Sequence, residues 1–234
     1  MATCPKLAEG DTIRLTRVDD CGRPVEGADN AFVDDCWAEV VMSPNVEDGT
    51  DISFKAMSGR SCGFKKGCPT FNGFDVNGKF FSASPEIIDI LTGNPVYLDF
   101  AGNPIGWDDC QVQCRGGFAL EIWQNVLGVE CEEGEEGLWF YWLLPWLTNG
   151  MLGEVTVGPE GVTFELTAAT RAGGGWELGP WDVQLQDDSP SPVVGPLLTV
   201  VGSDCHRRAF LTAVAPPTAA CEYVLVGSNN LPVS

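Results

Sequence analysis

Alternation of apolar and polar residues with a period of two is the feature that most limits the folds open to this chain. It is clearest at 154–167, where two alternating runs flank Gly158-Pro159-Glu160-Gly161. Because successive side chains of a strand point to opposite faces, and Gly and Pro favour turns, this pattern predicts a β-hairpin. The chain has 28 Gly and 16 Pro among 234 residues, which favours many short strands over long helices. The sequence therefore predicts an all-β fold.

The remaining elements follow from the same kind of pattern. Apolar runs or alternation predict strands in the segments 13–18, 36–42, 52–56 and 118–123. One helix is expected at about 84–92, because Ser84 suits the N-cap, Pro85 the first helical position and Gly93 the C-terminal stop. A helix of about two turns is not stable alone and must dock on a sheet. No boundary along the chain is sharp enough to divide it into two domains.

Several segments are expected to extend from that domain. Polar, acidic or Gly- and Cys-rich composition predicts loops near 19–35, 43–50 and 58–70, and a C-terminal arm near 227–234. These segments are longer than a sandwich needs, which suits contacts between subunits.

The charge balance excludes some classes of function. The chain has 13 Lys and Arg against 33 Asp and Glu, a net charge of −20. Binding to nucleic-acid phosphates or to an anionic membrane needs clustered cations, so neither is expected. One basic cluster does occur, Arg60, Lys65 and Lys66 in GRSCGFKKG. It lacks the pattern of a phosphate-binding loop. On so acidic a chain it predicts a cationic patch that docks onto an acidic face of a neighbouring subunit.

No catalytic residue, cofactor or metal site is predicted. His206 is the one histidine, and its neighbours Cys205 and Arg207 would diverge along a strand rather than converge on it. A Gly-x-Ser-x-Gly motif is absent, and the cysteine spacings lack the repeated pairs of a zinc site. The acidic run CEEGEEG at 131–137 predicts a solvated loop and lacks the calcium-loop spacing.

The cysteines leave two possibilities open, disulfides or free thiols. No secretory leader is apparent, which favours synthesis in a reducing cytoplasm, yet the cysteine content is high. The ten candidates for disulfides, with no pairing assigned, are Cys4, Cys21, Cys36, Cys62, Cys68, Cys110, Cys114, Cys131, Cys205 and Cys221.

The aromatic run 138–144 is apolar on both faces. As a strand it must be covered twice, by the core on one side and either by another subunit or by the rest of the sandwich on the other. Trp139 and Trp142 are therefore candidate contacts between subunits.

The order of these features resembles the major tail proteins, or tail tube proteins, of long non-contractile-tailed bacteriophages of actinobacteria. The resemblance covers most of the chain. It is carried by TRVDDCGRPVEG (16–27), ILTGNPV (90–96), GFALEIW (117–123), LLP (143–145), FELTAAT (164–170) and GWELGPWDV (175–183).

The resemblance implies a single tail-tube domain over 1–234, a β-sandwich or small barrel with one flanking helix. It also implies a virion protein of the tail with no enzymatic activity. Family members form hexameric rings that stack into a hollow tube, lined by a continuous β-barrel through which double-stranded genomic DNA passes into the host. Their partners are other copies of themselves and the tape measure, terminator and distal tail proteins. A charge of −20 per subunit suits such a conduit, because an anionic wall repels DNA and lets it slide. Disulfides formed after release from the host could lock the tube.

Three alternatives remain. The chain could be another tail or head-decoration protein of a virion. It could be a Trp-rich carbohydrate-binding β-sandwich, given its eight Trp, or an enzyme with an acidic active site.

Overall fold

The computed structural model of the chain describes residues 6–81, 84–110, 116–127, 137–158, 161–220 and 222–227. These residues form mostly β-strands with one α-helix, which confirms the predicted all-β fold. Within these ranges no helix is long and apolar enough to cross a bilayer. Cys4, Cys114, Cys131 and Cys221, the acidic loop at 131–136 and nearly all of the predicted C-terminal arm lie outside the described residues.

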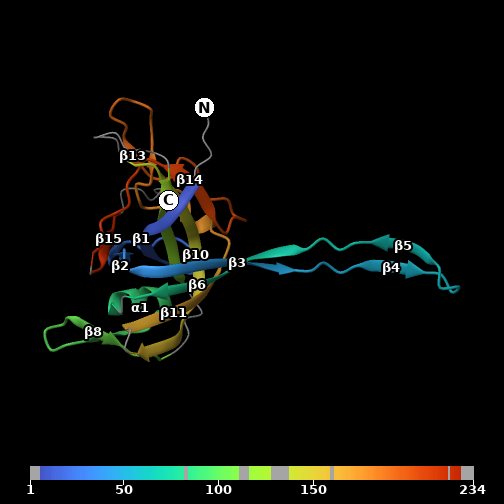
Figure 1. Cartoon of the computed structure of the whole chain (residues 1–234), viewed down its shortest axis with the longest axis horizontal. Helices are drawn as coiled ribbons and strands as arrows, with labels where there is room; N and C mark the ends of the chain where they lie inside the picture. The colour runs from blue at the N-terminus through green and yellow to red at the C-terminus, as the bar shows by residue number, and fades with distance from the viewer. Residues whose placement is uncertain are drawn as a thin grey trace.

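An antiparallel sheet organises the body (Figure 1). Its strands, in spatial order, are β15 (Val224–Val226), β2 (Gly27–Asp34), β1 (Lys6–Val18), β9 (Gly117–Leu127), β10 (Trp139–Gly158), β11 (Gly161–Thr170), β6 (Thr70–Phe80) and β3 (Trp37–Glu47), with β14 (Arg208–Thr212) added on β10. The predicted hairpin at 154–167 is confirmed, since Val157 pairs with Val162 across the turn between β10 and β11.

Strand β10 divides this sheet into two sections because it bends. Its pairing with β9 shifts register between Leu144 and Leu147, which accommodates Pro145, and two further shifts interrupt its pairing with β11. Asn149 has a φ of 57°, a left-handed conformation that asparagine tolerates. The large section comprises β15, β2, β1, β9, the first half of β10 and β14. The small section comprises the second half of β10, β11, β6 and β3.

The two sections face each other across a hydrophobic core. Alternate residues of β9, Phe118, Leu120 and Ile122, point into it. Side chains of β6 and β11, including Phe80 and Leu166, close it from the other side. The period-two pattern that predicts the strand at 118–123 thus marks the face that this strand buries.

The one α-helix of the described residues, α1 (Pro85–Thr92), packs on this core through Ile87, Ile90 and Leu91. Its bounds agree with the predicted 84–92. Gly93 ends it in the left-handed conformation, with a φ of 69°. Ser84 occupies the N-cap, but its hydroxyl bonds the Glu86 carboxylate and makes no side-chain bond to the first-turn N–H groups.

A second layer covers the outer face of the large section. The segment 171–201 includes the short helix η1 (Gly174–Trp176) and the strands β12 (Gln184–Leu185) and β13 (Val194–Gly195). Its buried Trp176, Val183 and Leu197 pack on the alternate face of the sheet, against Trp123 and Tyr141. Both faces of the aromatic strand are therefore covered by this chain itself.

Two hairpins project from the body in different directions (Figure 1). One contains β4 (Ile52–Lys55) and β5 (Ser61–Lys65) and continues the direction of β3 and β6. The other contains β7 (Val96–Leu98) and β8 (Pro104–Trp107) and follows α1.

The predicted loops need correction. Residues 27–34 of the loop predicted at 19–35 form β2, because Ala31, Phe32 and Val33 are buried and the strand pairs with β1. Most of the loop predicted at 43–50 is strand, since β3 continues to Glu47. The loop predicted at 58–70 contains β5. The segments 43–50 and 58–70, predicted as separate loops, are the two sides of one extended hairpin.

Candidate functional site

The arm, residues 48–69 with β4 and β5, is the most prominent feature of the molecule (Figure 1). It begins where β3 and β6 pair for the last time, at Glu47 and Thr70. At about 3.3 Å per residue, its strands reach roughly 30 Å beyond that pair. Its two strands pair with each other and form a sheet of their own, separate from the sheet of the body.

A narrow neck joins the arm tip to its base. There the backbones of Gly49 and Gly67 are in contact, and a Cβ added to Gly67 would lie 2.2 Å from the carbonyl carbon of Gly49. The Gly67 N–H also donates to the Asp51 carboxylate at 2.8 Å. Glycine is therefore required on both strands, since any side chain would force them apart.

The arm tip, residues 52–67, carries only positive charge. It contains Lys55, Arg60, Lys65 and Lys66 and no acidic residue, which leaves −24 on the rest of a chain whose net charge is −20. All four side chains are exposed, and none has a carboxylate partner among the described residues. The predicted cluster of Arg60, Lys65 and Lys66 is thus brought together on an isolated projection; whether it contacts a neighbouring subunit stays a prediction.

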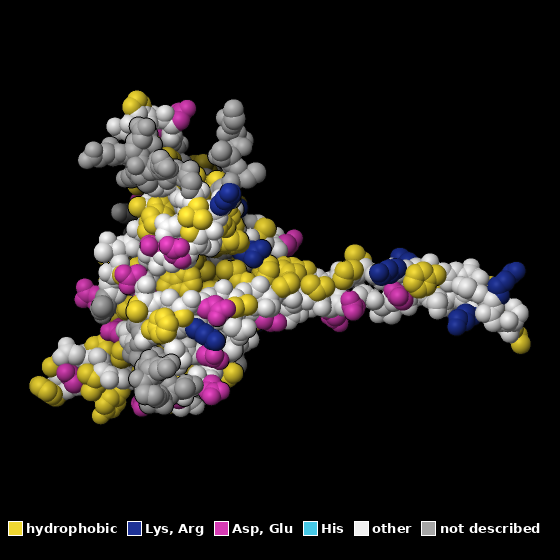
Figure 2. Space-filling view, in the orientation of Figure 1, with side chains coloured by type: hydrophobic (Ala, Val, Ile, Leu, Met, Phe, Trp, Pro, Cys, Tyr) yellow, Lys and Arg dark blue, Asp and Glu magenta, His cyan; other side chains and the backbone are white. Residues whose placement is uncertain are grey.

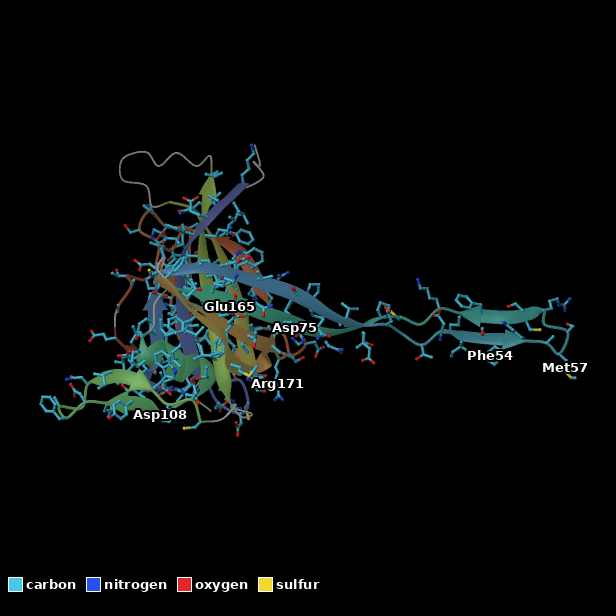
Figure 3. The ribbon with its side chains drawn as sticks, turned by 60° about the horizontal axis from the view of Figure 1, so that its bottom comes forward. Phe54, Met57, Asp75, Asp108, Glu165 and Arg171 are labelled. Carbon is cyan, nitrogen blue, oxygen red and sulfur yellow. The ribbon has the colours of Figure 1, made fainter. Side chains whose placement is uncertain are left out.

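Large apolar side chains lie among these cations. Phe54 and Phe64 are 66% and 65% exposed, and Met57 at the turn is fully exposed. Figure 2 shows yellow and dark-blue side chains interspersed along the arm, and Figure 3 shows Phe54 and Met57 directed into solvent. An exposed aromatic surface that also carries unpaired charge is typical of a protein contact.

The small section turns a polar face to solvent. Rows of residues cross its strands, such as Glu39 opposite Lys79 and Lys79 opposite Glu165. Asp75 lies on the same face near the base of the arm (Figure 3). Three carboxylates and one ammonium group make this face negative overall. Lys79 and Glu165 are about half exposed and 3.3 Å apart, an ion pair of little energetic weight.

The small section also has two open edges within the part of the chain that the structure describes. β3 pairs only with β6, and β10 beyond Leu147 pairs only with β11. An open edge presents unpaired N–H and C=O groups and can pair with a strand of another molecule. A four-stranded section with an edge free on each side can therefore be extended in both directions by further copies.

The two predicted tryptophan contacts are engaged within the chain. Trp142 donates its Nε1–H to Gln124 at 3.1 Å, and the Arg207 guanidinium lies 5.1 Å from its ring centroid. Trp139 and Phe210 pack on the hydrophobic cluster between the large section and the segment 171–201. Both remain half-buried. All eight tryptophans are described, and none is exposed, so they form no open aromatic strip.

His206 contacts a hydroxyl and an aromatic ring. Its Nδ1 lies 3.0 Å from the Thr170 hydroxyl, and its ring packs edge-on against Phe71 at 5.4 Å. A hollow of about 380 Å³ lies elsewhere, between β8 and the open edge of β10, lined by Trp107, Asp109 and Met151. In the described ranges no three metal-ligating side chains gather.

The six described cysteines are free, exposed thiols. Two of them, Cys62 and Cys68, lie on the arm. No disulfide joins the described residues.

Sequence reasoning missed the β7–β8 hairpin and the open edges. The hairpin had a signal, because VYLDFAGNPIGW places apolar residues on both sides of a Gly-Asn turn. The open edges had none, since edge and central strands of this kind have similar compositions.

A scan against protein-family models finds no match, and a search of curated proteins finds no significant relative. The function must therefore be inferred from the geometry of the arm and the open edges.

Proposed function

We propose that this chain is a structural subunit that polymerises into a hollow tube, the tail tube of a bacteriophage virion. Each copy contributes its small section to a continuous sheet around a channel, and hexameric rings stack through the arms. The tube conducts double-stranded DNA without binding it. The tape measure, terminator and distal tail proteins are its further partners.

The observation that carries this proposal is the arm. A cationic, aromatic hairpin about 30 Å long that leaves a body of charge −24 has its complement on another copy of the same chain. Attraction between opposite charges steers and orients such a contact, which would join the arm of one copy to the acidic body of another. Contacts between two different patches generate rings or open-ended assemblies rather than closed dimers.

The open edges and the polar face support a channel wall. Pairing β3 of one copy with β10 of the next removes the exposed edges and gives an uninterrupted sheet. Its solvent face then presents Glu39, Asp75 and Glu165 to the lumen, with Lys79 between two of them. A wall with net negative charge repels the phosphate backbone, so DNA passes without sticking.

The thiols of the arm suggest that disulfides stabilise the tube after it has assembled. Cys62 and Cys68 are exposed on the segment that would reach the neighbouring ring. Oxidation outside a reducing cytoplasm could link rings covalently. Finding every thiol free in mature particles would reject the lock but not the tube.

Electron microscopy of the full chain tests the proposal. Concentrated protein is imaged by negative stain with and without reductant, and we expect stacked rings or tubes. Persistence of a uniform monomer at every concentration, including with added tube fragments as seeds, would overturn it. Dissolution of preformed tubes by reductant alone would identify the cysteines as part of the assembly.

A matched pair of variants tests the arm itself. Lys65→Glu with Lys66→Glu reverses charge at the tip, whereas Lys6→Glu with Arg23→Glu makes the same change of net charge on exposed residues of the body. We expect the arm variant to remain unassembled in sedimentation and the body variant to polymerise. Equal assembly of both would show that the arm cations do not dock.

A further inference from the structure

The β7–β8 hairpin carries a second unpartnered apolar surface, independent of the arm. Phe100 at its turn is fully exposed, and Tyr97, Leu98 and Ile105 are 57%, 51% and 59% exposed. Four large apolar side chains gathered on one short hairpin exceed the scattered exposure that is normal on a monomer.

The turn that presents Phe100 is rigid. The Asp99 carboxylate accepts the backbone N–H groups of Ala101 and Asn103, both at 2.8 Å, and the Asn103 side-chain amide at 2.9 Å. The same hydrogen bonds, that of the Asn103 side chain most of all, hold the pKa of Asp99 below its usual value. Phe100 is therefore held outward before any partner arrives, which reduces the entropy lost on docking.

A groove of about 180 Å³, with aromatic, aliphatic and polar groups in its lining, lies elsewhere on the body, between β3 and the large section. Trp37, Val40, Met42 and Trp142 line it. Trp37 donates its Nε1–H to the Asp11 carbonyl at 3.2 Å, and the Trp142 indole is tied to Gln124. The walls are thus fixed, as in a preformed site. Hydrophobic side chains form a band along β3 towards the arm (Figure 2).

Charge selects between the possible occupants of this groove. At its end the exposed Arg207 guanidinium stacks on Trp142 and, at 4.5 Å, on Phe74, with no carboxylate partner among the described residues. The arm tip is cationic and would be repelled by this group. The β7–β8 hairpin carries a single charged residue from 96 to 107, the ionised Asp99. The tip of the β7–β8 hairpin, with Phe100 beside the carboxylate of Asp99, is called the knob below. This acidic aromatic knob complements a cationic aromatic groove.

The two surfaces also lie on opposite sides of the subunit. The hairpin adjoins the open edge of β10, because Trp107 and Met151 line one hollow. The groove adjoins the other open edge, because β3 supplies three of its lining residues. In Figure 1 the β7–β8 hairpin and the arm that follows β3 point away from each other. One copy therefore offers the knob on the side where the next copy offers the groove.

We propose that the β7–β8 hairpin of one copy inserts Phe100 into the groove of the next copy, beside the paired edges of β10 and β3. The inference rests on the proposed tube, since it specifies a contact between neighbours in one ring. The contact is heterologous, so each subunit uses its knob and its groove once.

Photo-crosslinking tests this contact. Phe100 is replaced by the photo-reactive benzoylphenylalanine, and the full chain is assembled from a mixture of ¹⁴N- and ¹⁵N-labelled protein. We expect crosslinks from position 100 to a peptide containing 37–42 or Trp142 of a differently labelled copy. The same probe at Leu198, 53% exposed on the outer layer, should give none in the groove.

The outcomes separate the two proposals. Crosslinks to another surface in assembled protein, or within one copy, would overturn the hairpin contact and leave the tube intact. Crosslinks to the groove from the same probe at Phe54 would assign the groove to the arm and also overturn the inference. Failure of the unsubstituted chain to assemble would overturn both proposals.

A truncation gives a second measure. Phe100→Ala removes a fully exposed ring, so the fold should be unaffected. We expect the concentration for half-maximal assembly to rise about tenfold or more, as for a central aromatic anchor, and Leu198→Ala to leave it unchanged. An unchanged value for Phe100→Ala would contradict the contact.

Discussion

Replacing Glu121 by Gln should destabilise the subunit more than any change to a surface charge. Glu121 on β9 is fully buried and accepts two hydrogen bonds from the Arg14 guanidinium, each 2.6 Å long. The Tyr141 hydroxyl donates to the same carboxylate at 2.5 Å. Arg14 is itself buried, with its guanidinium 4.2 Å from the Trp181 ring centroid. This network therefore joins the large section to the layer that covers it.

The expected magnitude follows from these contacts. In Glu121→Gln the amide nitrogen cannot accept from Arg14, so one charge-assisted bond is lost and the other no longer joins opposite charges. The Arg14 charge stays buried without a counter-ion, a situation that costs about 3–5 kcal/mol. Gln keeps one acceptor oxygen, so we expect the lower end, about 3 kcal/mol. Since the whole free energy of unfolding is about 5–15 kcal/mol, this loss is large.

Urea unfolding followed by tryptophan fluorescence measures the effect, at concentrations where the chain is unassembled. With a slope near 3 kcal/mol per M, the midpoint should fall by about 1 M. The matched control is Glu165→Gln in the half-exposed pair with Lys79, where the expected change is below about 1 kcal/mol. A loss below about 1 kcal/mol in Glu121→Gln would refute the reasoning. The pair Arg14→Met with Glu121→Leu should recover most of the stability.

Two further predictions concern single sites of the fold. Asp34 has a buried Oδ2 with no hydrogen-bond partner among the described residues, and burial raises its pKa. Because the folded-state pKa is the higher one, this group favours folding only at low pH, and that contribution is lost as pH rises through the folded pKa. Asp34→Asn, which cannot ionise, should therefore lose less stability than the parent chain as pH rises from about 4 to 7, as urea midpoints across pH would show. Gly150→Ala should cost about 2–3 kcal/mol, because its Cβ would lie 1.7 Å from the Leu91 carbonyl oxygen, whereas Gly106→Ala, with its nearest neighbour at 3.9 Å, should change the melting temperature little.

Local signals in the sequence predicted the elements whose burial is one-sided. The strand at 118–123 buries Phe118, Leu120 and Ile122 on one face, so its alternation reported the core directly. The helix was predictable because Pro85 and Gly93 act through the backbone at its two ends, whatever packs against it.

The arm was not predictable, because a period-two pattern does not state whether either face is buried. Residues 52–56 alternate as a half-buried strand would, yet Ile52 and Phe54 are exposed. Their partner strand β5 lies in the Gly- and Cys-rich segment 58–70, whose composition predicts a loop. Only the pairing of Ile52 with Lys65 and Phe54 with Gly63 makes both segments extended. Under the proposed function the complement of this surface lies on another copy, and local sequence patterns carry no signal for such a contact.

The aromatic run shows the opposite limit. Both faces of this strand are apolar, so each must pack against another layer. The sequence does not indicate which of these two layers belongs to the same chain. The segment 171–201 supplies the outer one, with Trp176 buried against Tyr141. That segment has almost no regular secondary structure. Its apolar residues therefore follow no helical or strand period from which a core layer could be predicted. Cover of the outer face by this layer directs attention for assembly away from Trp139, which packs beneath it, and towards the two hairpins.

In the proposed tube, segregation of charge reconciles two demands on the subunit. A body of charge −24 keeps free copies apart in solution, which prevents random association. If the four arm cations were spread over that body, every approach between copies would meet net repulsion. Gathered on a projection about 30 Å long, they offer attraction in one direction only and beyond the reach of most of the body's own carboxylates, since the Debye length is about 8 Å at physiological salt. In the proposed assembly, association is confined to the orientation in which an arm meets a neighbouring body, and the apolar surfaces of the arm and of the β7–β8 hairpin come into contact only after that orientation is reached. The charges of such a subunit would determine which copies meet and how, and the buried apolar area would determine how long they stay together.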